Sequence, residues 1–153
     1  MNIYLSNKMT GIPYFNAPWF DKVTAELRAL PATGEVFNPA DHDRENGFEP
    51  MSCPTGTLEE AFRNGFKQID ALVSDWVWIG RIADCVVVGP DWHDSKGAIS
   101  EMACAQAIGK PVYEYGPFLA AWDKPHLIQF KLPPIMELGG KPDWFADWRF
   151  NGT

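Results

Sequence analysis

The sequence predicts an α/β domain of the flavodoxin-like (Rossmann-like) class, a three-layer sandwich with a mostly parallel sheet of four to five strands. Short apolar runs alternate with amphipathic segments over residues 2–115, in the order strand, helix, strand, helix, strand, helix, strand. The run Cys85–Val88 is continuous and rich in β-branched residues, as is typical of a strand buried on both faces of a parallel sheet. Helical crossovers between these strands make the sheet parallel.

The first half of the chain predicts two strands and one helix. Residues 2–6 are expected to form a strand, followed by a polar loop over residues 7–13. Asn16 is the expected N-cap of the next helix, with Pro18 in its first turn. A second, short strand is expected over residues 35–37. The apolar face of the helix has amphipathic spacing and consists of Phe20, Val23, Leu27 and Leu30.

A long loop and a long helix are expected next. Residues 41–56 are polar, rich in turn formers and without a period, which predicts a long, mobile loop. Thr57 and Glu60 form a capping box, so a helix is expected to begin there and to continue to residue 79 or 80. Its apolar positions follow at helical spacing and are Phe62, Phe66, Ile69, Val73, Trp76 and Ile79.

The second half of the predicted domain contains a strand, a helix and a last strand. The strand Cys85–Val88 ends at Gly89, and a helix is expected from about Ser95 to Ala107. Gly109 ends that helix before a fourth strand at residues 111–115.

The length of 153 residues fits one domain, which we place at residues 1–116, with a C-terminal extension at residues 117–153. Four aromatic residues lie within residues 142–150, and such a segment is costly to leave in water. The extension is therefore expected to pack on its own domain or on a neighbouring subunit.

Charge and cysteine usage restrict the partners and the compartment. The formal net charge of −7 argues against a nucleic-acid polymer or an anionic membrane as partner, whereas a small phosphate ligand needs only a local site. The three cysteines form no Cys-x-x-Cys motif, and neither a signal peptide nor a membrane span is evident, so a cytoplasmic protein is expected. His42 lies between two aspartates but has no second histidine nearby, so no metal site is expected.

Polar residues follow the first and third strands, whose carboxyl ends are expected to meet at one edge of the sheet. Ligands of open α/β sheets bind at that edge, so Asp91, Asp94, Ser95 and Glu101 are expected to face one crevice. Ser95 opens a helix, where unpaired N–H groups favour an anion such as phosphate. Each of the candidate residues also has a structural interpretation. Glu101 is then a solvated residue early in its helix, Asp75 is a surface residue of the long helix, and Tyr4 is a residue of the core.

Three motifs resemble those of the nucleoside 2-deoxyribosyltransferase superfamily: Tyr4 in Ile-Tyr-Leu-Ser, Asp75 in Asp-Trp-Val-Trp-Ile, and Ser95 to Glu101 in Ser-Lys-Gly-Ala-Ile-Ser-Glu. The most similar enzymatic branch is that of the 2'-deoxynucleoside 5'-monophosphate N-glycosidases. The Met-Thr-Gly-Ile-Pro segment at residues 9–13 also resembles an uncharacterised branch common in bacteriophage genomes. The resemblance covers roughly residues 2–115 and departs from the family at Asn7 and Lys8, where relatives usually carry Gly-Pro or Gly-Ser.

The resemblance implies an N-glycosidase with Glu101 as nucleophile, Asp75 as acid and Tyr4 as orienting group. The partner is then a small nucleotide or nucleoside, no cofactor or metal is needed, and a homodimer or larger homo-oligomer is expected, in the host cytoplasm if the protein is phage-encoded. Base transfer, a non-catalytic nucleotide sensor and NAD glycohydrolysis remain alternatives. The phosphoribohydrolase group is disfavoured because its Gly-Gly-x-Gly-Thr motif is missing. The expected substrate-binding residues are Ser6, Asn7, Lys8, Thr10, Gly11, Asp91, Asp94, Ser95 and Gly97.

Overall fold

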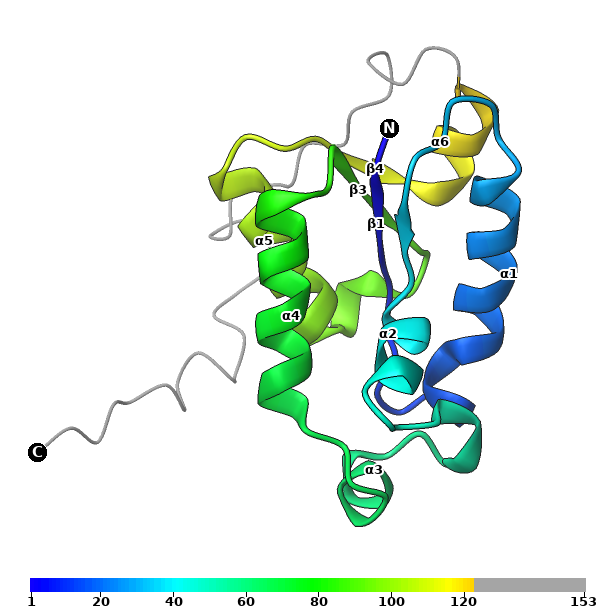
Figure 1. Ribbon diagram of the computed structural model, residues 1–153, viewed down its shortest axis with the longest axis vertical. Coiled ribbons are helices and arrows are strands. Elements are labelled where there is room, and N and C mark those ends of the chain that lie inside the picture. Colours follow the sequence, from blue (N-terminus) through cyan, green and yellow to red (C-terminus); the bar gives the residue numbers. More distant parts are fainter. Residues whose placement is uncertain (123–153) are drawn as a thin grey trace, which may run out of the picture.

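The computed structural model describes residues 1–122, and the aromatic segment at residues 142–150 lies outside the described residues. The described chain forms an α/β three-layer fold around a four-stranded sheet in the order β2-β1-β3-β4 (Figure 1). Every strand pair is parallel, which confirms the predicted flavodoxin-like architecture. The strands are β1 (Ile3–Ser6), β2 (Val36–Phe37), β3 (Cys85–Val88) and β4 (Val112–Glu114).

Helices cover both faces of the sheet. Helices α1 (Ala17–Arg28) and α6 (Tyr115–Ala120) lie on one side, and α4 (Gln68–Arg81) and α5 (Lys96–Ala107) lie on the other (Figure 1). Successive strand residues point to opposite faces, so Ile3 and Leu5 pack with α1 whereas Tyr4 packs with the α4 and α5 layer. Tyr4 therefore faces the two helices that carry Asp75 and Glu101.

The expectation of a mobile loop over residues 41–56 is wrong. This stretch contains α2 (Pro39–Glu45) and a 3-10 helix, η2 (Pro50–Ser52). The side-chain oxygen of Asn38 caps α2 by accepting a hydrogen bond from the Ala40 N–H at 2.9 Å. Phe48 is buried in a small core with Phe15. Residues 41–56 have no hydrophobic period, but the Asn38 cap and the packing of Phe48 against distant residues order them.

The expectation of one long helix from Thr57 is also wrong, because the chain breaks between α3 (Leu58–Arg63) and α4. Gly65 lies at the break with φ of +86°, a left-handed conformation that ends a helix. The Thr57 side chain caps α3 by accepting from the Glu60 N–H, as predicted. The Glu60 carboxylate instead accepts from Thr55, so the reciprocal half of the capping box does not form.

Asn16 precedes α1, as predicted, but it makes no side-chain cap. Three consecutive residues, Tyr14 to Asn16, have φ between 52° and 59°, within the 3-10 turn η1 (Pro13–Asn16). This left-handed turn directs the Asn16 amide to the backbone oxygen of Lys8, at 2.9 Å, instead of to the helix N–H groups. Asn16 therefore supports the loop after β1.

The last elements follow the predicted pattern. The Ser95 side chain caps α5 by accepting from the Ala98 N–H, and Gly109 follows the helix with φ of +74°. Helix α6 crosses the expected domain boundary at residue 116, and Phe118 is fully buried in the α1 layer. Within residues 1–122, no helix is long and apolar enough to cross a membrane, and no group of His, Cys, Asp and Glu is arranged to hold a metal ion.

Candidate active site

The loops after β1 and β3 meet at the carboxyl edge of the sheet, as predicted. The Asp91 N–H donates to Asn7 Oδ1 at 3.0 Å, and Lys8 Nζ lies 2.7 Å from Asp94 Oδ2. Gly89 makes this approach possible, because a Cβ there would lie 2.4 Å from Asn7 Cγ. Asn7 and Lys8 therefore hold the two loops together.

Two buried carboxyl groups converge beneath these loops. Asp75 on α4 and Glu101 on α5 are each 7% exposed. The Ser6 hydroxyl, at the end of β1, donates to Glu101 Oε2 at 2.5 Å. Because α4 and α5 pack side by side on one face of the sheet, residues separated by 26 positions in the sequence share one site. Asp75 and Glu101 are both buried, which removes the interpretation of either as a solvated surface residue.

Tyr4 lies between the carboxyl groups and the sheet. Its hydroxyl is completely buried close to both carboxyl groups, and it forms no hydrogen bond of ordinary geometry with the described residues. Its ring stacks on Phe37, with centroids 5.0 Å apart. Burial raises the pKa of Tyr4, and the charges of Glu101 and Asp75 raise it further. The phenol therefore stays protonated and can donate to either carboxylate or to a bound ligand.

Burial also raises the pKa of both carboxyl groups. The pKa of Asp75 is raised to about 8, first by burial and then by the charge of Glu101. The pKa of Glu101 is raised to about 7 by burial, against which the Ser6 hydrogen bond acts. The first proton to leave such a pair makes the second harder to remove. The pair therefore loses its two protons in separate steps, and between these steps one group is an acid and the other a base or nucleophile.

The expected phosphate residues lie around the start of α5. A Cβ on Gly97 would be 3.9 Å from both Glu101 Oε1 and Ser95 Oγ, an ordinary van der Waals contact, so Gly97 lies directly beside the carboxylate. Asp91 and Asp94 are exposed, and the Lys8 ammonium lowers the pKa of Asp94. Ser95 caps α5, and Lys8 pairs with Asp94, two residues before the helix begins.

Thr10 and Gly11 are placed differently. Both are exposed, and the Gly11 N–H donates to the Gly56 oxygen at 2.8 Å. No contact between Thr10 or Gly11 and the carboxyl pair occurs among the described residues. The structure therefore ties this part of the loop to the segment before α3.

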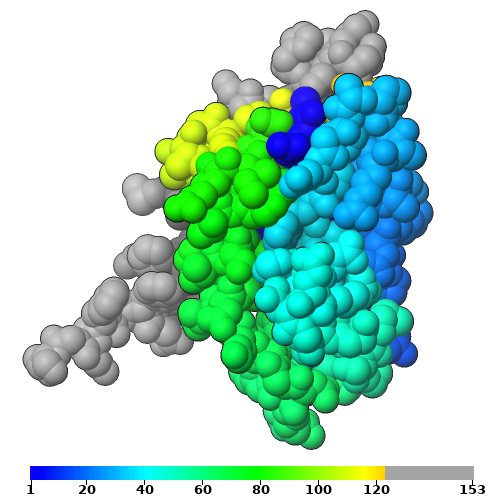
Figure 2. Space-filling model, in the orientation of Figure 1, coloured from blue at the N-terminus to red at the C-terminus, as the bar shows by residue number. Residues whose placement is uncertain are grey.

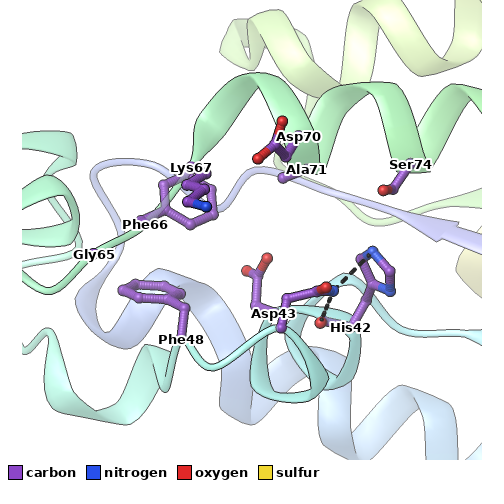
Figure 3. Close-up of a pocket in the computed structure, with 10 residues that line it drawn as sticks. His42, Asp43, Phe48, Gly65, Phe66, Lys67, Asp70, Ala71 and Ser74 are labelled. Carbon is purple, nitrogen blue, oxygen red and sulfur yellow. Dashed lines mark hydrogen bonds between the residues drawn. The ribbon is translucent and has the colours of Figure 1, made fainter.

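A cavity that sequence reasoning missed lies between α2 and the start of α4, with a volume of about 150 Å³ (Figure 3). Asp43 lines it, is 7% exposed, and has a pKa raised to about 7 by burial, with Arg44 opposing. The sequence does contain a signal for α2, the helix that carries Asp43. It is the pair Asn38-Pro39, an N-cap followed by proline at the first helical position. The other lining residues are His42, Asn46, Phe48, Gly65, Phe66, Lys67, Asp70, Ala71 and Ser74.

A wider groove of about 660 Å³ lies along the β2 edge, between α2 and α4. Figure 2 shows these two helices side by side on one face of the molecule. The groove is lined by Phe37 of β2, His42 of α2 and Trp78 of α4. Neither this groove nor the smaller cavity is lined by Tyr4, Asp75 or Glu101.

Comparison with known proteins identifies a family without a known activity. The model of the family described as Domain of unknown function (DUF4406) matches residues 1–114, which include every strand of the sheet. No curated protein and no solved structure matches the chain. Because the match spans most of its length, the chain belongs to the DUF4406 family.

Proposed function

We propose that the protein is an N-glycosidase that cleaves the bond between base and sugar in a 2'-deoxynucleoside 5'-monophosphate. The observation that carries this proposal is the convergence of two buried carboxyl groups, Asp75 and Glu101, with an unpartnered hydroxyl, that of Tyr4. A carboxylate beneath the anomeric carbon stabilises the oxocarbenium-like transition state, and a protonated carboxyl group assists departure of the base. The resemblance of the three motifs to the deoxyribosyltransferase superfamily supports the same residues in these roles.

In the first step, the Glu101 carboxylate attacks C1' of the sugar. The C1'–N bond breaks, its electron pair goes to the base, and the base takes the proton of Asp75. In the second step, water attacks C1'. The ester bond between C1' and Glu101 breaks and regenerates the Glu101 carboxylate, while the Asp75 carboxylate accepts a proton from the water. If a second base attacks instead of water, the same intermediate leads to base transfer.

The surrounding residues have supporting roles in this mechanism. The Ser6 hydroxyl holds one oxygen of Glu101 by its hydrogen bond of 2.5 Å. The Tyr4 hydroxyl donates to whichever carboxylate carries charge. The 5'-phosphate binds at the start of α5, where Ser95, the helix N–H groups and Lys8 favour an anion.

A nucleotide sensor without turnover is the second candidate function. It is favoured by the low exposure of Glu101, at 7%, and by the ion pair that occupies Lys8. A sensor raises its melting temperature with a nucleotide that it does not consume. An N-glycosidase consumes the nucleotide, so melting curves and product analysis on one sample separate the two functions.

The deciding experiment is chromatography of free base released from ribo- and deoxynucleosides, their 5'-monophosphates and NAD. We expect release from a deoxynucleoside 5'-monophosphate, and its loss in Glu101→Gln. Glu59→Gln is the matched control, because Glu59 is an exposed residue of α3 paired only with Arg63. Release that persists in Glu101→Gln, or no release from any compound, would overturn the proposal.

The resemblance also implies a homodimer or larger homo-oligomer. Light scattering coupled to size exclusion measures the molar mass, which we expect to be at least twice the 17.2 kDa of one chain. A mass of one chain at micromolar concentration would contradict this expectation.

A further inference from the structure

The cavity between α2 and α4 contains a buried carboxylate without a partner. Figure 3 shows the Asp43 side chain pointing into the space between α2 and the start of α4. Asp43 is 7% exposed, and its carboxylate takes part in no hydrogen bond or ion pair within residues 1–122. Buried polar groups are nearly always paired, and an unpaired one carries a desolvation cost. A ligand that donates hydrogen bonds to Asp43 would remove that cost.

The size and the walls of the cavity favour a ligand with a single ring. Its volume is about 150 Å³, and an apolar cavity of about 150 Å³ is known to hold one benzene ring. Phe48 and Phe66 line one end, with ring centroids 4.9 Å apart. Aromatic faces and edges of this kind bind a flat heterocycle. A purine, with two fused rings, needs more of this space than a pyrimidine does.

The cavity shares helix α4 with the carboxyl pair. Ala71 and Ser74 of α4 line the cavity, and Asp75 is the next residue of the same helix. The charge of Asp43 also contributes to the raised pKa of Asp75, which places the two carboxyl groups within electrostatic range. A ring held by Asp43 therefore lies within electrostatic range of the proposed acid, which does not itself line the cavity.

We propose that this cavity binds an amino-substituted pyrimidine as the leaving base, with Asp43 accepting a hydrogen bond from the exocyclic amino group. The identity of the ligand as a leaving base rests on the proposed function, whereas the binding of a free base does not. A pyrimidine with oxygen in place of the amino group presents an acceptor to the Asp43 carboxylate. That arrangement leaves two acceptors facing each other, so such a base is rejected.

Binding of free cytosine, uracil and adenine measures this preference directly. Titration calorimetry at pH 8.5 keeps Asp43 ionised, since its pKa is about 7. We expect cytosine to bind at least about tenfold more tightly than uracil, and adenine to bind weakly. Equal affinity for cytosine and uracil, or tighter binding of adenine, would overturn the inference.

Asp43→Asn tests the residue, because an amide can donate to the uracil oxygen. We expect this variant to lose the preference for cytosine or to reverse it. Glu59→Gln is the matched control, at an exposed carboxylate of α3 that pairs with Arg63 and does not line the cavity. A variant that keeps the wild-type preference would contradict the role of Asp43. If Asp43→Asn fails to fold, cytosine must still shift the ring resonances of Phe48 and Phe66 in the wild type, and unchanged resonances count against the site.

The base-release assay separates failure of this inference from failure of the proposed function. Cytosine binding that depends on Asp43, without release of base from any nucleotide, supports the binding site and contradicts the N-glycosidase. Release of purines and pyrimidines at equal rates, unaffected by Asp43→Asn, supports the N-glycosidase and contradicts the binding site.

Discussion

Asp43 and Arg44 are neighbours in α2, yet they lie in opposite electrostatic environments. Arg44 faces α1, where its NH1 and NH2 nitrogens each lie 2.9 Å from a carboxylate oxygen of Asp21. This pairing lowers the pKa of Asp21. Asp43 faces the cavity, has no cation paired with it among the described residues, and has a pKa raised to about 7 by burial. One step along α2 thus separates the arginine that lowers the pKa of Asp21 from an aspartate whose own pKa is raised.

The carboxyl pair follows the pattern of Asp43. Asp75 and Glu101 are buried, and neither forms an ion pair within the part of the chain described. A cation beside either carboxylate would keep it ionised and remove its capacity to donate a proton near neutral pH. The acidic residues with a capacity for proton transfer are therefore those buried without a cation. The carboxylates around Arg44 have a structural role.

The largest expected effect comes from replacing Asp75, the proposed acid, with a residue that cannot release a proton. We expect Asp75→Asn to lower kcat/KM by about 10² to 10⁴, and to abolish the fall in activity at alkaline pH, because the amide cannot titrate. The pH profile of base release measures both changes. Glu59→Gln, at an exposed carboxylate of α3, serves as the control. A variant with the wild-type alkaline limb would show that another group supplies the proton.

Stability is expected to fall as pH rises from about 4 to about 8. The folded pKa values of Asp43, Asp75 and Glu101 lie above their ordinary values of 3.8 to 4.5. In this interval the folded state holds protons that the unfolded chain has lost, so a rise in pH favours unfolding by a few kcal/mol in order of magnitude. Urea unfolding at several pH values measures the trend. Asp21, with a lowered pKa, has the opposite effect, since its stabilisation is lost as pH falls through its folded pKa.

Replacing all three buried carboxyl groups by amides provides the control for this trend. The triple variant, Asp43→Asn with Asp75→Asn and Glu101→Gln, is expected to show a flatter stability profile between pH 4 and pH 8. An unchanged slope would assign the pH dependence to other groups.

Removing the cation from α2 is expected to have an intermediate effect. Arg44→Met loses contacts with Asp21, Asp41 and Glu49, so the free energy of unfolding is expected to fall by about 1–2 kcal/mol. Denaturant unfolding of Arg44→Met, Asp21→Asn and the double variant measures the coupling. Fully additive losses would contradict a direct interaction between Arg44 and Asp21.

The smallest effect is expected at the exposed ion pair of the site. Asp94→Asn frees Lys8 from its partner at 2.7 Å and makes its ammonium available to a phosphate. The KM for a deoxynucleoside 5'-monophosphate is expected to fall about two- to fivefold, while the KM for the nucleoside stays the same, because exposed ion pairs are weak. Steady-state kinetics on both substrates measure the difference. An equal change for both would place the phosphate elsewhere.

Elements with a strong local signal could be predicted from the sequence. The apolar run Cys85–Val88 and the helix cap at Ser95 are read directly from residue order, and the structure confirms both. The helix α2 and the break at Gly65 were missed. Gly65 and the pair Asn38-Pro39 are local signals for them, whereas the contacts between distant segments that order α2, such as Arg44 with Asp21, have no local pattern.

The sequence by itself determined the layers of the fold, because the alternation of apolar runs with amphipathic helices has one compact solution in a parallel sheet. It also placed Tyr4, Asp75 and Glu101 on three separate elements. Only the tertiary structure decided that these groups are buried together, and that Asp43 joins them from α2. Burial, rather than residue type, raises their pKa values, and burial depends on how helices that are distant in the sequence pack against the same sheet.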